Sequence, residues 1–246
     1  MMTVKQNIED LQDRLKYSGF GESLHQELEK QVKSGKSEIE LHLTKDPDNK
    51  KLDYHLHFRK SEEGRYFYNG FDATLTHADG RELSQRFYHN QGISAKEAFN
   101  LLEGRAVFKS LFNREGERYN AWLQLDLRQK DDKGQHPVKQ YHQNYGFDLE
   151  KEVTKLPIAS IENPDQKDLL FYSLKKGNLH SVELEDREGR FHLEANPRFK
   201  SLNLYDASGK RLAAEGLSAK QDQDSKAQKK PAKAQKRTRA RKYKGM

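Results

Sequence analysis

Three histidines in the first quarter of the sequence come nearest, by type and spacing, to a metal site. His55 and His57 are two positions apart in an alternating segment, so on a β-strand they share the face opposite Tyr54. If the preceding segment pairs with this one, His42 and Glu40 join that face, and three imidazoles with a carboxylate can hold zinc. The same pattern is typical of the solvated face of a hairpin. We favour that interpretation and predict no metal ligands, with a metal-dependent enzyme as the lesser alternative.

Other catalytic and nucleotide-binding motifs are absent from the sequence or incomplete. The run Gly35-Lys36-Ser37 lacks the glycine that a phosphate-binding loop needs five positions earlier, where Lys30 stands. Neither Gly-x-Ser-x-Gly nor His-Glu-x-x-His occurs. The chain has no cysteine, which excludes disulfides, thiolate zinc sites and cysteine nucleophiles. We therefore expect no catalytic residues, no cofactor and a non-enzymatic protein.

The single tryptophan, Trp122, has two possible roles. Aromatic side chains on single-strand binding surfaces stack on bases, and Trp122 can do the same. However, Leu123, Leu125 and Leu127 follow it in a strongly apolar segment. That context favours packing in the core or at its edge.

Charge is distributed very unevenly along the chain. The net charge of the 246 residues is +7. Residues 218–246 contain eleven basic and two acidic side chains, a net charge of +9, whereas residues 1–217 carry −2. The terminal segment has no Leu, Ile, Val or Phe, so it cannot bury enough surface to offset its ordering entropy. We therefore predict a foldable body and a disordered basic tail.

The composition of this tail predicts binding to DNA or RNA. A flexible cation of this density binds polyphosphates by releasing counterions, without reading sequence. The basic composition of the tail has three rival explanations, which are binding to an acidic protein partner, binding to a membrane surface, and solubility alone. The lack of apolar residues in the tail weighs against a membrane. The predicted nucleic-acid-binding residues are Lys229, Lys230, Lys233, Lys236, Arg237, Arg239, Arg241, Lys242 and Lys244.

Hydrophobic spacing predicts short helices and antiparallel strands in the body. Apolar residues recur at helical spacing over 8–15 and 24–32, which predicts two N-terminal helices. Alternating segments then indicate strands, and Asp79-Gly80 is a strong hairpin signal. The predicted strands of this part are 39–43, 54–58, 66–76 and 83–88.

A capping box marks the next helix. Ser94 is its expected N-cap, Glu97 stands three positions later, and Gly104 fits its C-terminal end. Residues 107–112 predict a further short turn of helix. A helix over 164–176 follows later, with turns at Arg187-Glu188-Gly189 and Asn196-Pro197. The strands expected in this second half are 119–127, 138–142, 179–185, 191–194 and 202–205.

These elements predict an α+β protein of antiparallel hairpins with interspersed short helices. The organisation we expect is an N-terminal helical segment, an α+β body, and the basic tail. The pairs Tyr88-His89 and Tyr141-His142 are each followed by a glycine and then by a predicted helix. This similarity suggests a diverged strand–turn–strand–helix repeat within the body. The boundaries are 1–36 for the helical segment, 37–217 for the body, 66–104 and 119–156 for the repeat, 179–205 for a C-terminal β segment, and 218–246 for the tail.

Several blocks resemble an uncharacterised domain family found in proteins of bacterial conjugative and mobilisable elements. The blocks are 93–107 (ISAKEAFNLLEGRAV), 119–126 (YNAWLQLD), 174–178 (LKKGN) and 194–197 (EANP). The Leu-Leu-Glu-Gly-Arg run is specific for the family, and the resemblance covers most of residues 37–210. It implies work connected with DNA transfer but no assigned chemistry and no catalytic residues.

The expected function is therefore that of a cytoplasmic accessory protein of a mobile genetic element. Its body would dock an unidentified protein partner, and its tail would bind nucleic acid without sequence specificity. The alternative is an adaptor or inhibitor whose tail does not bind nucleic acid. No membrane association is expected, because no stretch approaches 18 uninterrupted apolar residues and no secretory-type segment opens the chain.

Overall fold

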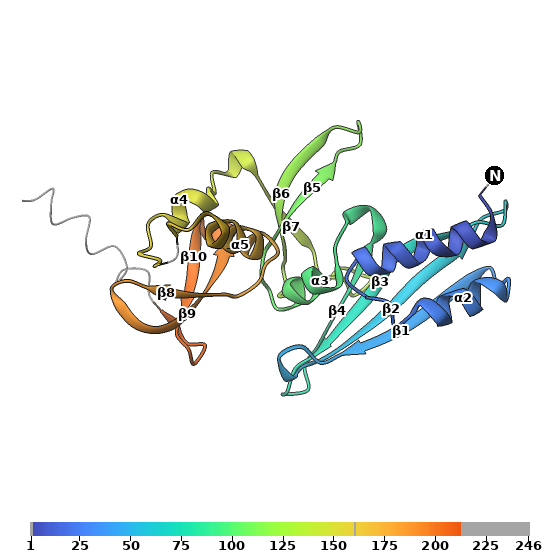
Figure 1. The fold of residues 1–246 in the computed structure, drawn as a ribbon, viewed down its shortest axis with the longest axis horizontal. Helices are drawn as coiled ribbons and strands as arrows, with labels where there is room; N and C mark the ends of the chain where they lie inside the picture. The colour runs from blue at the N-terminus through green and yellow to red at the C-terminus, as the bar shows by residue number, and fades with distance from the viewer. Residues whose placement is uncertain (1, 160, 213–246) are drawn as a thin grey trace, which may run out of the picture. The chain divides into compact units, whose positions relative to one another are not determined.

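The computed structural model describes residues 2–159 and 161–212, in which helices accompany three antiparallel sheets (Figure 1). The α+β class predicted from the sequence is confirmed. One compact unit spans Met1–Leu212. The predicted tail, 218–246, lies outside the described residues.

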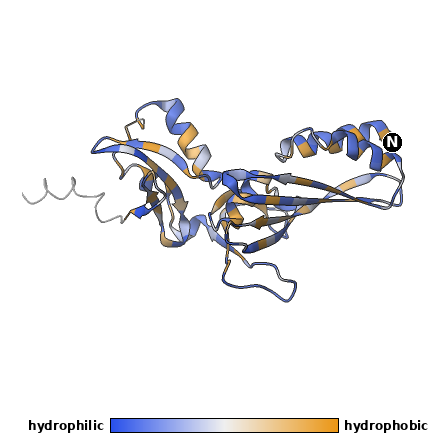
Figure 2. Ribbon diagram, turned by 90° about the horizontal axis from the view of Figure 1, so that it is seen from below, coloured by the Kyte–Doolittle hydropathy of each residue, from blue (hydrophilic) through white to orange (hydrophobic). Residues whose placement is uncertain are grey.

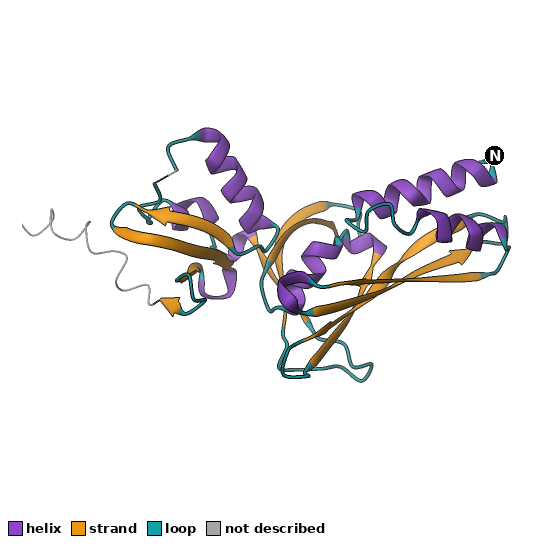
Figure 3. Cartoon of the chain, turned by 60° about the horizontal axis from the view of Figure 1, so that its bottom comes forward, coloured by secondary structure: helices purple, strands orange, loops and turns teal. Residues whose placement is uncertain are grey.

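The first sheet is a four-stranded meander whose one face is covered by helices (Figure 3). Along its strands, buried apolar side chains alternate with more exposed and mostly polar ones, and Figure 2 shows hydrophobic and hydrophilic residues interspersed along the ribbon. The strands are β1 (Glu38–Lys45), β2 (Lys51–Lys60), β3 (Tyr66–Thr76) and β4 (Glu82–Tyr88), and the helices are α1 (Val4–Tyr17), α2 (His25–Lys33) and α3 (Ala95–Leu102).

The N-terminal helices form where the sequence predicts them. Thr3 and Gln6 cap α1 reciprocally, and the apolar stripe of each helix is buried against the first sheet. Phe20, in the linker between them, meets the rings of Tyr54 and Phe71 edge-on at 5.3 and 5.1 Å. The two helices therefore share one core with the sheet.

The second sheet corrects one prediction. It consists of β5 (Val107–Phe112), β6 (Arg118–Leu125) and β7 (Val138–His142), so residues 107–112 form a strand and not a helical turn. The six residues of β5 pair with β6, from Val107 opposite Leu123 to Phe112 opposite Arg118. The short apolar run 107–112 fits the residue spacing of a helix as well as that of a strand. Hydrogen bonding to the longer strand β6 makes it a strand.

The third sheet completes the body and corrects a predicted turn. Its strands are β8 (His180–Leu184), β9 (Arg187–Asn196), β10 (Ser201–Tyr205) and β11 (Arg211–Leu212), accompanied by α4 (Leu149–Val153) and α5 (Pro164–Lys175). The chain turns at Glu185-Asp186, whereas Arg187, Glu188 and Gly189 already belong to β9. A register shift next to Glu183 lets the longer strand begin earlier than the glycine suggested.

The proposed repeat shows local similarity in backbone. Short 3-10 turns at His89–Gln91 and Gln143–Tyr145 each end on a left-handed glycine, Gly92 with φ 60° and Gly146 with φ 85°. Each glycine is followed by a capped helix, α3 or α4. The strands that lead into these turns belong to different sheets, β4 to the first and β7 to the second.

Candidate nucleic-acid interface

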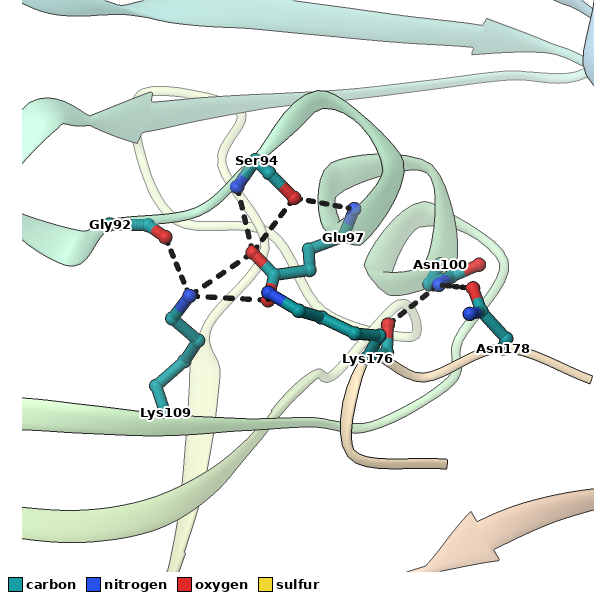
Figure 4. Close-up of polar contacts among 7 residues, drawn as sticks. All are labelled: Gly92, Ser94, Glu97, Asn100, Lys109, Lys176 and Asn178. Carbon is teal, nitrogen blue, oxygen red and sulfur yellow. Dashed lines mark hydrogen bonds and ion pairs between the residues drawn. The ribbon is translucent and has the colours of Figure 1, made fainter. Parts of the chain in front are cut away.

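A buried ionic cluster joins the second half of the body to α3. Glu97 is 1% exposed and completes the predicted capping box, with Ser94 donating from its backbone N at 2.8 Å and from its Oγ at 2.9 Å. Lys109 Nζ on β5 lies 3.1 Å from one carboxylate oxygen, and Lys176 Nζ lies 2.9 Å from the other. Figure 4 shows the two lysines reaching Glu97 from different elements. One carboxylate thus ties α3, β5 and the end of α5 together.

Neighbouring hydrogen bonds hold the loop after α5 against α3. Asn100 Nδ2 donates to Lys176 O at 2.7 Å and to Asn178 Oδ1 at 2.9 Å (Figure 4). The buried Arg105 donates from Nε to Gly177 O at 2.9 Å and from Nη2 to Asn100 Oδ1 at 2.7 Å. The sequence segments 93–107 and 174–178 therefore meet here, and we call this contact between α3, β5 and the loop after α5 the joint.

The pKa of the Glu97 carboxyl lies below its usual value. Burial by itself raises this pKa, but the charge of Lys109, the Ser94 backbone and the bond to Lys176 together outweigh burial. The group is therefore a carboxylate at neutral pH and acts as a fixed charge that positions the surrounding elements.

The histidine face of the first hairpin has no metal geometry. His42 and His55 are register partners whose rings lie 4.3 Å apart. His57 stands between two carboxylates, with Nε2 at 2.6 Å from Asp72 and Nδ1 at 3.3 Å from Glu40. In residues 2–159 and 161–212, no three such side chains converge as metal ligands. The structure thus gives these histidines a ring contact and short contacts with carboxylates on the polar side of the sheet.

One face of the second sheet bears a basic hollow of about 380 Å³. We use this name for the cavity between the end of β6, β7 and the turn that follows β9. Asp126 forms ion pairs with Arg128 at 3.3 Å and with Lys139 at 4.0 Å. Burial raises the pKa of the Tyr141 hydroxyl, and the positive charge of nearby Arg198 partly opposes that rise. The polar residues lining the basic hollow are Gln124, Asp126, Arg128, Lys139, Tyr141 and Arg198.

An aromatic groove lies beside the basic hollow on the same face. Trp122 is 5% exposed, and the half-buried rings of Phe108 and Phe147 stand edge-on to it, both at 5.4 Å between centroids. Trp122 is therefore buried as its context predicts, but it also forms the floor of a groove of about 840 Å³. Phe171 and Lys175 on α5 line the opposite side.

Sequence reasoning singled out Trp122 on this face of the second sheet but not the cations of the basic hollow. The nine predicted tail residues lie outside the described residues, so the structure neither places nor groups them. The sequence analysis did not identify the three cations of the basic hollow, because they come from separate segments that carry no excess of positive charge. They are Arg128, Lys139 and Arg198. The available signal was the alternation of Lys139 and Tyr141 on β7 opposite Gln124 and Trp122 on β6.

No protein family, curated protein or solved structure matched this chain in the comparisons made with them. In residues 2–159 and 161–212, no helix is long and apolar enough to cross a membrane.

Proposed function

We propose that this protein is a cytoplasmic, non-enzymatic accessory protein of a mobile genetic element that binds nucleic acid through its terminal tail. The observation that carries the proposal is the separation of charge, with +9 on residues 218–246 and −2 on residues 1–217. A cationic segment of this density neutralises phosphates without contacting base edges. The body would then be free to dock a protein partner while the tail keeps the assembly on DNA or RNA.

Salt dependence tests this proposal quantitatively. If the tail neutralises about six phosphates of a duplex, log affinity should fall against log salt with a slope of roughly −5. The decisive variant replaces the nine predicted residues with glutamine, which leaves residues 218–246 with two basic and two acidic side chains. We call this full-length chain the tail-neutral variant.

Fluorescence anisotropy with a labelled duplex at several salt concentrations provides the measurement. We expect the tail-neutral variant to lose most of the affinity and most of the slope. A matched control, in which the order of residues 218–246 is shuffled, should bind like the native protein because only charge density matters. Equal binding by the native and tail-neutral proteins, or binding that ignores salt, would refute the role of the tail.

A protein-interaction module is the second candidate, favoured by an apolar strip on α5. Leu169 is 52% exposed and Tyr172 is 61% exposed, and they stand three positions apart on one helix face. A partner that stays bound to the tail-neutral variant after nuclease treatment, and is lost on the paired change Leu169→Gln and Tyr172→Gln, would favour this function. Loss of the partner on nuclease treatment alone would favour the first.

A further inference from the structure

We propose that the body itself holds a second nucleic-acid contact, in which the basic hollow binds phosphates of a single strand and the aromatic groove stacks its bases. This inference rests on the proposed function, since it assigns the body a share in nucleic-acid binding. The two features are neighbours because Trp122 and Tyr141 are register partners on β6 and β7, and opposite residues of an antiparallel pair project from the same face.

The charge in the basic hollow exceeds what its own carboxylate can neutralise. Arg128, Lys139 and Arg198 face a single acidic group, Asp126, so the hollow carries a surplus of two positive charges. Asp126 lies within ion-pair distance of Arg128 and Lys139. Within the described part of the chain, Arg198 has no carboxylate partner and is exposed. The surplus is therefore available to an anion, and an Arg guanidinium suits the geometry of phosphate.

Aromatic rings continue from the basic hollow along the same face. Tyr141 packs on Tyr145 with centroids 5.0 Å apart, and Lys200 Nζ lies 4.9 Å from the centre of the Tyr145 ring. Tyr145 is 39% exposed, so part of its ring is open to a ligand. Rings interleaved with cations are the arrangement by which single-strand binding proteins stack bases and neutralise the backbone.

The aromatic groove contributes stacking surface more than charge. Phe108 and Phe147 are half-buried above Trp122, which fixes their orientation. On the rim, Lys167 is paired with Glu150 at 2.9 Å, and Lys175 lies 5.7 Å from the Phe108 ring centre. Asp148 and Asp168 also line the groove, so its two lysines stand against three carboxylates and the positive charge for the backbone comes from the basic hollow alone. Duplex DNA has its bases stacked inside and cannot use such rings, so the geometry points to unpaired bases.

The tail of this chain does not suit the same surface. Residues 218–246 carry a net charge of +9, and the basic hollow carries the same sign. Like charges repel, so the tail gains nothing by occupying the hollow.

The test uses two full-length variants with equal loss of charge. The hollow variant carries Arg128→Gln, Lys139→Gln and Arg198→Gln. The control variant removes three exposed cations from other elements, with Lys5→Gln, Lys30→Gln and Arg114→Gln. The probe is a labelled 20-nucleotide oligothymidylate, and affinity is measured by anisotropy over a range of salt concentrations.

We expect the hollow variant, and not the control variant, to reduce the magnitude of the salt slope by roughly 1.4, because the two surplus charges make two single-strand phosphate contacts that contribute about 0.7 each. The single change Arg198→Gln, at an exposed position, should lower it by about 0.7 and keeps the test valid if the triple variant unfolds. Equal slopes for the hollow and control variants would overturn the site. That failure is distinct from failure of the tail, which shows as equal binding by the native and tail-neutral proteins.

Stacking is tested separately with an abasic strand of the same length. Loss of one stacked base costs about fivefold or more in affinity, so the native protein should prefer the oligothymidylate by at least that factor. The changes Tyr141→Leu and Phe147→Leu should remove the preference while keeping the salt slope. A native protein that binds both strands equally would overturn the stacking half of the proposal.

Discussion

Replacement of Glu97 by glutamine is the sharpest test of how the body is held together. In the native protein, the carboxylate accepts from Ser94 N at 2.8 Å and forms ion pairs with Lys109 and Lys176. Glutamine keeps one carbonyl oxygen for Ser94, so the capping of α3 survives. Its amide NH₂ is a donor, however, and would face two ammonium groups that are also donors.

The cost follows from the exposure of the two lysines. Hydrogen bonds to charged groups contribute about 1.5–3 kcal/mol each. The side chain of Lys176 is 33% exposed and can turn to water, whereas that of Lys109 is 14% exposed and stays bound to Gly92 O at 2.6 Å. Lys109 therefore keeps a buried charge without its counter-ion. We expect Glu97→Gln to lower the free energy of unfolding by about 3 kcal/mol.

Urea unfolding followed by circular dichroism measures this loss. With an m-value of about 2.5 kcal/mol/M, the midpoint should fall by about 1.2 M. The matched control is Glu115→Gln, at an exposed position, which should change the free energy of unfolding by less than about 0.5 kcal/mol. If Glu97→Gln moves the midpoint no more than this control does, the joint does not stabilise the fold and the reasoning is wrong.

The same ion cluster predicts a pH dependence. The folded pKa of Glu97 lies below the ordinary value of 4.5, so the unfolded chain takes up the proton first as pH falls. The stabilisation by Glu97 is fully present above about pH 4.5 and is lost as the pH falls through the folded pKa. The difference in unfolding free energy between the native protein and Glu97→Gln should therefore shrink below pH 4.5. A difference that stays constant down to pH 3 would contradict the assignment of the charge to Glu97.

Two further substitutions test the loop after α5. At Gly177, φ is +77° and an added Cβ would lie 2.8 Å from Ala106 O, so Gly177→Ala should destabilise the fold by about 3 kcal/mol. Gly35→Ala, with φ +75° and open space, should cost only the backbone strain of about 1 kcal/mol, and equal midpoints for the two variants in urea would contradict the close approach. Arg105→Lys replaces a planar fork with a single ammonium group and loses a bond to either Gly177 O or Asn100 Oδ1, so a loss of about 2 kcal/mol is expected in thermal or urea unfolding. An unchanged midpoint for Arg105→Lys would show that the guanidinium geometry is not needed.

The sequence by itself determined the local elements of this protein and the separation of its charge. Alternating residues predicted the first sheet, and Ser94 with Glu97 predicted the start of α3, because these signals depend on neighbours within a few positions. The two errors arose where local signals were ambiguous. The apolar residues 107–112 suited a helix as well as a strand, and Gly189 looked like a turn but lies inside β9.

The tertiary structure alone decided which distant side chains meet. The sequence presented Glu97 as a capping residue, but only folding brings Lys109 and Lys176 to its carboxylate. Likewise, Arg128 and Arg198 stand 70 positions apart, and no periodicity connects residues at that separation. The spacing of apolar residues indicates which face of its own helix or strand a residue occupies. Which faces come into contact depends on how the sheets and helices pack against one another. That is why the basic tail is visible in the sequence and the basic hollow is visible only in the fold.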